Sequence, residues 1–158
     1  EDVHIGDVVV ADRLIQHDLD ARPLWPRHVV PLLETGEFPC DAGMADALES
    51  AARRFEAAGR GGRGHRGLIA SGDQFIHGPK MGEGVREALP ETLCVEMEGA
   101  AVAQVCHEYG VPFAVFRAIS DRADSAAAAD FGVSLGSFAA AHTAGILSLA
   151  LNEATGTA

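Results

Sequence analysis

The stretch LCVEMEGAAVAQVCHEYG, residues 93–110, carries the pattern that decides the fold. Its first three residues, Leu93–Val95, form an apolar run that is typical of a buried strand, and the strand is expected to extend to Glu96. An alanine-rich helical pattern follows from Glu98 to Tyr109 and ends at Gly110, a residue that commonly terminates helices. A strand that passes directly into a helix is one unit of an α/β fold.

Two carboxylates, Glu96 and Glu98, flank Met97 at the junction of this strand and helix. A buried strand end is a poor place for carboxylates unless the protein or a ligand supplies hydrogen-bond donors. Because strand neighbours alternate between faces, residues two apart face the same side, so both carboxylates are candidates to hold a ligand. For Glu96 a second interpretation is equally open, in which it accepts hydrogen bonds from the backbone.

The alternation of strands and helices continues on both sides of this stretch. Strands are expected at Val8–Val10, Gly67–Ser71, Leu93–Glu96 and Pro112–Ile119, and helices at Ala42–Ala58, 82–88, Glu98–Tyr109 and about Val133–Leu151. Each strand is a nearly continuous apolar run, which is typical of strands buried on both faces. The sequence therefore predicts an α/β fold in which helices cover both faces of a mainly parallel sheet.

Two segments show neither the apolar periodicity of a strand nor that of a helix. Residues 21–41, here called the excursion, contain four prolines and are expected to be irregular, with Leu24 and Trp25 exposed. The excursion is either functional or a loop folded on its own surface. The sequence GRGGRGHR at 59–66 is expected to be a flexible turn that begins with a helix-terminating Gly59.

Composition excludes several classes of protein. With 158 residues, 47% of them hydrophobic, the chain is long enough for one domain with a core. A formal net charge of −11 opposes binding to nucleic acid and to anionic membranes, so we expect neither partner. No apolar run approaches the length of a membrane span. The three cysteines form no CxxC pair, which suits a reducing cytoplasm.

Polar residues gather where the expected strands end. Ser71-Gly72-Asp73 ends one strand, Glu96-Met97-Glu98 the next, and Arg117 with Ser120-Asp121 the last. In open α/β sheets ligands bind outside the carboxyl ends of the strands, so these groups are expected on one rim. Together with Phe75 they suit a polar ligand that has a flat ring and several hydroxyl groups.

Other site chemistries find little support in the sequence. The seven histidines are scattered and form neither HExxH nor a zinc-type Cys/His spacing, so no metal is expected. No GxGxxG follows a strand, and GPKMGEG lacks the closing lysine and hydroxyl of a P-loop. Neither Ser71 nor Ser120 lies in a GxSxG frame.

Several ordered motifs resemble one known family. The segments GDVVVADRLIQHDLD (6–20), ASGDQFI (70–76), VEMEGAAVAQVCHEYGVPF (95–113) and FRAISDRAD (116–124) are similar to 5′-methylthioadenosine/S-adenosylhomocysteine nucleosidases of the nucleoside phosphorylase superfamily. The resemblance implies a three-layer α/β/α fold with a central mixed, mainly parallel sheet. It also implies a cytoplasmic homodimer without cofactor, which hydrolyses the N-glycosidic bond of these nucleosides and releases adenine in methionine salvage.

The resemblance also implies roles for individual residues. Asp121 is expected to protonate or hydrogen-bond N7 of adenine, Ser120 to orient that carboxylate, and Glu98 to bind the ribose hydroxyls. Phe75 is expected to stack on adenine. The full set of implied substrate-binding positions is Phe75, Ile76, Glu96, Met97, Arg117 and Phe131, beside the catalytic Asp121, Glu98 and Ser120.

Two departures from the family pattern stand out. Family members carry, ahead of the matched part, a glycine-bearing loop and an early glutamate that activates water, and residues 1–158 match neither. We therefore expect these residues to be the C-terminal two-thirds of a single nucleosidase domain, incomplete at the N-terminus. A missing N-terminal segment is then a partner, and the chain alone is expected to hydrolyse nucleosides poorly. In the excursion, Leu24 and Trp25 stand where the family usually offers aromatic residues to the 5′ end of the substrate.

Three alternatives remain open. A purine nucleoside phosphorylase shares the Glu-Met-Glu and Ser-Asp motifs but needs a cationic phosphate pocket, for which Arg117 is a thin basis. A nucleosidase acting on aminofutalosine uses the same residues. A non-catalytic subunit or a storage protein of the same fold has no need for Asp121, Ser120 and Glu98 on one rim.

Overall fold

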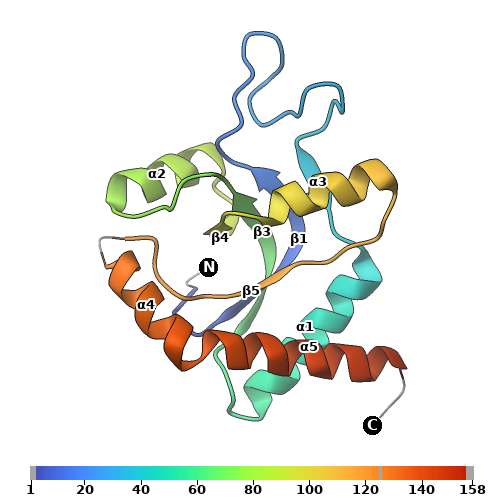
Figure 1. Ribbon diagram of the computed structural model, residues 1–158, viewed down its shortest axis with the longest axis vertical. Helices are drawn as coiled ribbons and strands as arrows, with labels where there is room; N and C mark the ends of the chain where they lie inside the picture. The colour runs from blue at the N-terminus through green and yellow to red at the C-terminus, as the bar shows by residue number, and fades with distance from the viewer. Residues whose placement is uncertain (1–2, 125, 156–158) are drawn as a thin grey trace.

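A long first strand, β1 (Val8–Gln16), organises the sheet. One edge of β1 pairs in parallel with β3 (Gly64–Ser71), which pairs in parallel with β4 (Thr92–Glu96). The other edge pairs antiparallel with β2 (Glu37–Pro39) and with β5 (Phe116–Ala118). This computed structural model describes residues 3–124 and 126–155, and its mixed sheet is drawn in Figure 1.

Helices cover both faces of the sheet. They are α1 (Ala42–Ala57), α2 (Pro79–Ala88), α3 (Gly99–Tyr109), α4 (Ala127–Ser137) and α5 (Ala139–Thr155). Val8 and Val10 of β1 belong to a core with α1 and α5, whereas Val9 belongs to a core with α3. Because neighbouring side chains of a strand point to opposite faces, β1 contributes to both cores. The expected three-layer α/β/α fold with a mixed sheet is confirmed (Figure 1).

The strand that was expected at Val8–Val10 continues to Gln16. An irregularity in the pairing with β3 lies between Ala11 and Arg13, which is typical of a β-bulge. The charged residues that follow the apolar run hid this continuation in the sequence. Beyond the apolar run, β1 still contributes to the core, because Leu14 is fully buried.

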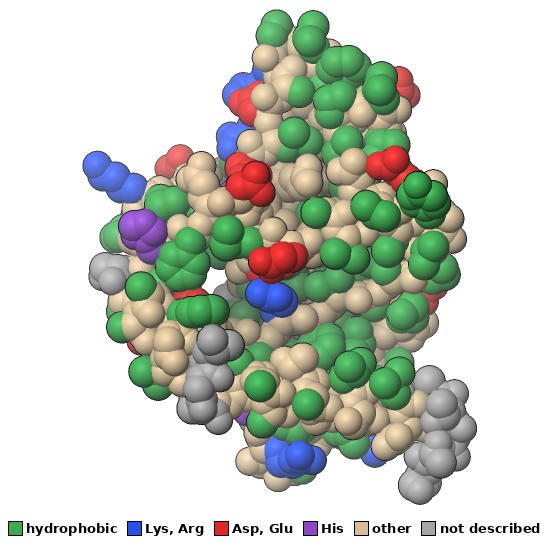
Figure 2. Space-filling view, in the orientation of Figure 1, with side chains coloured by type: hydrophobic (Ala, Val, Ile, Leu, Met, Phe, Trp, Pro, Cys, Tyr) green, Lys and Arg blue, Asp and Glu red, His purple; other side chains and the backbone are tan. Residues whose placement is uncertain are grey.

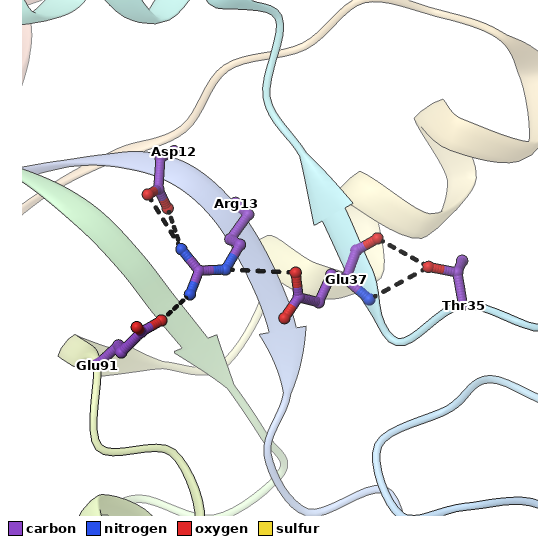
Figure 3. Close-up of polar contacts among 5 residues, drawn as sticks. All are labelled: Asp12, Arg13, Thr35, Glu37 and Glu91. Carbon is purple, nitrogen blue, oxygen red and sulfur yellow. Dashed lines mark hydrogen bonds and ion pairs between the residues drawn. The ribbon is translucent and has the colours of Figure 1, made fainter.

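The Arg13 guanidinium joins three carboxylates beside this bulge (Figure 3). It lies 3.1 Å from Asp12 and 3.4 Å from Glu37 of β2, and it also contacts Glu91, which precedes β4. Thr35 fixes the start of β2, because its hydroxyl donates to the Glu37 carbonyl at 3.0 Å. These contacts connect the two outer strands to β1.

The expectation of an irregular excursion was wrong for Glu37–Pro39, which forms β2. Phe38 is fully buried, while Glu37 and Pro39 are exposed, so the strand has the alternation of a sheet edge. Proline is tolerated there because an edge strand does not need every N–H for pairing. Elsewhere in the excursion Leu24 is exposed, as expected, and Trp25 is partly buried.

Several boundaries differ from the sequence expectation. The segment 59–66 is not wholly a turn, because β3 begins at Gly64. Gly59 does follow the end of α1, as expected, and has a positive φ of 67°. The short helix begins at Pro79 rather than at 82, and the strand at Pro112–Ile119 is reduced to Phe116–Ala118.

The single last helix, expected at about Val133–Leu151, is two helices. α4 ends at Ser137 and α5 begins at Ala139, with a turn at Phe138 between them. The Phe138 ring packs against His142, one turn into α5, at 4.9 Å between centroids. Within residues 3–124 and 126–155, no helix combines the length and apolarity needed to cross a membrane.

Candidate active site

The nine residues that the family resemblance named line one cavity of about 360 Å³, whereas Ser71 and Asp73, which were also expected on this rim, are not part of its lining. The cavity lies among the end of β4, the loop after β3, the chain that follows β5, and α4. Its lining comprises Gln74, Phe75, Ile76, Val95, Glu96, Met97, Glu98, Arg117, Ser120, Asp121 and Phe131. The expectation of one polar rim therefore agrees with the fold for these nine side chains.

The expectation that all the strands end at the same edge of the sheet is wrong for β5. β3 and β4 run parallel and end at the same edge of the sheet, but β5 runs antiparallel to β1. Ser120 and Asp121 are instead positioned by main-chain bonds to the start of β1. The Ile119 N–H donates to the Asp7 carbonyl at 2.8 Å, and the Gly6 N–H donates to the Ile119 carbonyl at 2.9 Å.

The Asp121 carboxylate is held on both oxygens. The Ser120 hydroxyl donates to Oδ2 at 2.8 Å, and the Ala123 N–H donates to Oδ1 at 2.9 Å. The side chain is only partly buried, so it faces the cavity while its orientation is fixed. A carboxyl group held this way can present one face to a ligand atom.

A buried hydrogen-bonded pair, Asp7 and His65, supports the backbone below Asp121. Asp7 accepts hydrogen bonds from the His65 ring at 2.9 Å and from the Arg63 N–H at 2.8 Å. Burial opposes ionisation of Asp7, but hydrogen bonds from two backbone N–H groups and from His65 hold its pKa below the ordinary value. The same residue thus holds Arg63 and His65 by its side chain and Ile119 by its carbonyl.

Glu96 uses its carboxylate within the protein. Its oxygens accept hydrogen bonds from the Gly99 N–H at 2.8 and 2.9 Å and from the Glu98 N–H at 3.0 Å, and the Ser71 hydroxyl also donates to it. Glu96 is 8% exposed, and its carboxylate lies at the N-terminus of α3, where the helix dipole favours negative charge. Of the two interpretations left open for Glu96, these contacts favour the structural one.

Glu98 behaves differently because β4 ends at Glu96, so the alternation of strand faces does not extend to it. Glu98 precedes the first residue of α3, makes no capping bond, and has a side chain that is 68% exposed. Its carboxylate lies 3.8 Å from the Arg117 guanidinium. A carboxylate and a guanidinium thus face the cavity as a loose, solvent-accessible pair.

Aromatic side chains form the apolar wall. The Phe75 and Phe131 rings meet edge to face at 6.2 Å, and His77 lies nearly parallel to Phe75 at 6.3 Å. Phe75, Phe131 and Met97 are each about two-fifths exposed, although they are large and apolar. An exposed aromatic wall beside fixed polar groups is typical of a site for a flat ring.

Sequence reasoning missed two lining residues, Gln74 and Val95. Both stand inside the motifs that were recognised, next to Phe75 and Glu96, so their position was the only available signal. Among the residues that the structure describes, no group of three histidine, cysteine, aspartate or glutamate side chains could hold a metal ion.

A second cavity, of about 460 Å³, adjoins the first and shares Ile76, Val95, Arg117, Ser120 and Asp121 with it. It lies between β4 and residues 117–123, and Arg86 and Arg122 also line it. Burial raises the pKa of the Cys94 thiol in its wall to about 12, so this cysteine stays protonated.

Comparisons with known proteins agree with this geometry. A sequence model of the Phosphorylase superfamily matches residues 1–149. The 5′-methylthioadenosine/S-adenosylhomocysteine nucleosidase of Anoxybacillus flavithermus is 35% identical over 152 residues, which cover 96% of this chain and 63% of that protein. The chain thus spans about three-fifths of the length of this curated relative.

Two solved structures are similar throughout this chain. The Neisseria meningitidis 5′-methylthioadenosine/S-adenosylhomocysteine nucleosidase in complex with methylthio-immucillin-A superposes with a TM-score of 0.87 at 35% identity, covering 96% of this chain and 63% of that one. A futalosine hydrolase mutant of Helicobacter pylori gives a TM-score of 0.84 at 32% identity, covering 97% and 64%.

Proposed function

Because the chain belongs to the phosphorylase superfamily, we propose that it provides the adenine- and ribose-binding site of a 5′-methylthioadenosine/S-adenosylhomocysteine nucleosidase. The observation that carries this proposal is the single cavity in which the fixed Asp121 carboxylate faces the same space as Glu98 and the Phe75 wall. The reaction is hydrolysis of the bond between C1′ of the ribose and N9 of adenine.

The purine ring is proposed to lie against Phe75, with Phe131 closing the apolar side and the backbone of Ile76 reading its edge. Asp121, in its protonated form, gives a proton to N7, while Ser120 and the Ala123 N–H keep the carboxyl group aimed. As the glycosidic bond breaks, its electron pair passes into the purine, and protonation makes adenine a better leaving group. Adenine then departs neutral.

The sugar becomes an oxocarbenium-like cation in the transition state. Glu98 is proposed to bind the ribose hydroxyls with Met97 against the sugar, and its negative charge lowers the energy of that cation. Water adds its hydroxyl to C1′ and loses the remaining proton to solvent. Glu96 is proposed to support this step by anchoring the backbone of Glu98 rather than by touching substrate.

Phosphorolysis is the second candidate, and one observation favours it. Three arginines, Arg86, Arg117 and Arg122, line the adjoining cavity, although the chain as a whole is acidic. A phosphate held there would replace water as the nucleophile. A futalosine-type nucleoside is a further substrate candidate, because a futalosine hydrolase is among the similar structures.

We also propose that the protein is a homodimer. On α3 the exposed Val102, Val105 and Tyr109 form an apolar stripe, and Leu24 and Leu32 of the excursion are exposed as well. Figure 2 shows hydrophobic side chains spread over α3 and the excursion on one face of the molecule. A second copy covering this face would bury them. Three free cysteines are consistent with the proposed cytoplasmic location.

The test is chromatographic detection of adenine released from 5′-methylthioadenosine, with and without phosphate. It is run on the purified chain and on the chain joined to the part of the Anoxybacillus flavithermus relative that it does not match. Adenine release without phosphate is expected, and faster in the joined protein. Strict dependence on phosphate would favour phosphorolysis, and no release from either protein would overturn the proposal.

A further inference from the structure

The loop between β3 and α2 places three residues in the candidate site. Gln74, Phe75 and Ile76 line the cavity, and the loop that carries them begins directly after Ser71. At its start the Gly72 N–H donates to the Glu96 carbonyl at 3.1 Å. The next residue, Asp73, donates its N–H to the Asp18 carboxylate at 2.7 Å.

Asp18 lies outside the cavity but touches this loop closely. A Cβ atom on Gly72 would lie 2.9 Å from Cγ of Asp18 and 2.3 Å from Nε2 of the buried His17. Only glycine leaves room for such an approach. The His17–Asp18 turn and the first residues of the loop are therefore in direct contact.

The excursion holds this turn from the other side. The His28 N–H donates to the Leu19 carbonyl at 2.9 Å, and a ring nitrogen of His28 lies 3.1 Å from the Gln16 carbonyl. Arg27 donates to the His17 carbonyl at 3.4 Å. Asp18 thus connects this fixed turn, to which it belongs, to the loop that carries Phe75.

We propose that Asp18 is a positioning residue that fixes the 72–77 loop so that Phe75 can stack on the base; this inference rests on the proposed function. Stacking on adenine is present both in the bound substrate and in the transition state. Loss of an interaction that serves both states equally raises KM and leaves kcat unchanged. Asp18 should therefore control substrate binding rather than the chemical step.

The experiment measures KM and kcat for adenine release from 5′-methylthioadenosine, using the more active of the two proteins above. Asp18→Ala is expected to raise KM about tenfold, the effect typical of a hydrogen bond to a charged acceptor, and to change kcat less than about twofold. Asp18→Asn keeps an acceptor oxygen and is expected to restore most of the affinity. Asp20→Ala, which removes an exposed carboxylate paired with Arg22 in the same region, is the matched control.

Hydrogen exchange at the amides of residues 73–76 gives a readout independent of activity, and it should quicken in Asp18→Ala but not in Asp18→Asn. An unchanged KM in an active Asp18→Ala protein, or a loss confined to kcat, would overturn the inference. An Asn variant as impaired as the Ala variant would do the same. Absence of adenine release by the unsubstituted protein would instead overturn the proposed function, and the inference with it.

Discussion

The Ser120 hydroxyl donates a 2.8 Å hydrogen bond to the carboxylate of its neighbour Asp121. Together with the Ala123 N–H on the other oxygen, it fixes the carboxyl plane before any ligand arrives. An acid that must reach one ring nitrogen benefits from such preorganisation, because no reorientation is then needed in the transition state.

Asp121→Asn should lower kcat for adenine release by roughly 10²- to 10⁴-fold, since asparagine keeps the shape but carries no carboxyl proton. Ser120→Ala keeps the acid and should lose much less. Steady-state kinetics and the urea midpoint of each variant provide the measurement. A folded Asp121→Asn protein with near-native turnover would remove Asp121 from the role of acid.

Glu96→Ala should destabilise the fold by about 2–4 kcal/mol, because two backbone N–H groups and the Ser71 hydroxyl lose a buried acceptor. Urea unfolding gives this difference. The exposed Glu87 of α2 offers a matched control, and its change to alanine should stay within about 0.5 kcal/mol. Equal effects at the two positions would mean that Glu96 does not anchor α3.

Asp7 should make stability depend on acid pH. Its folded pKa lies below the ordinary 3.8, so its contribution is fully present above that value and disappears as pH falls through the lowered pKa. The stability difference between the unsubstituted protein and Asp7→Asn should therefore be constant near neutrality and shrink below about pH 4. A difference that does not vary down to pH 3 would contradict the pairing with His65.

His142 should act at higher pH. Burial lowers its pKa below 6.5, so protonation favours the unfolded chain, and stability should fall as pH drops below 6.5. His142→Phe fits the aromatic contacts with Phe55 and Phe138 and should flatten this part of the profile. Burial also lowers the pKa of His17, so the stability of the His142→Phe protein should still decrease somewhat as pH falls below 6.5. The free energy of unfolding in urea, measured between pH 7 and 5, tests this. Asp7→Asn is the control and should show the same pH dependence as the unsubstituted protein in this range.

The sequence predicted the layers of the fold from local apolar patterns, and the resemblance to a known family named nine residues that line one cavity. Apolar runs indicated β3 and β4, and the ordered motifs placed Phe75, Glu98 and Asp121. The direction of β5 could not be predicted in this way, since hydrophobicity says nothing about which way a strand runs beside its partner.

Two further points depended on contacts between distant parts of the chain. β2 was missed because three residues among prolines become a strand only when Phe38 finds the core beneath β1. Glu96 and Glu98 have the same chemistry, so the sequence could not assign them different roles. Their roles differ because β4 ends at Glu96, and Glu98 therefore does not follow the alternation of the strand. Glu96 faces the helix N-terminus, and Glu98 faces the solvent-accessible cavity.

The pairing of β1 with β5 has a consequence for the time at which the site forms during synthesis. Val8 and Ala118 lie opposite each other, although 118 − 8 = 110 residues separate them along the chain. At a ribosomal rate of about 5–20 residues per second, the first strand waits roughly 5–20 s for this partner. Until then the start of β1 lacks the neighbour that carries Ser120 and Asp121, so a nascent chain can assemble β1 with β3 and still have no place for its acid.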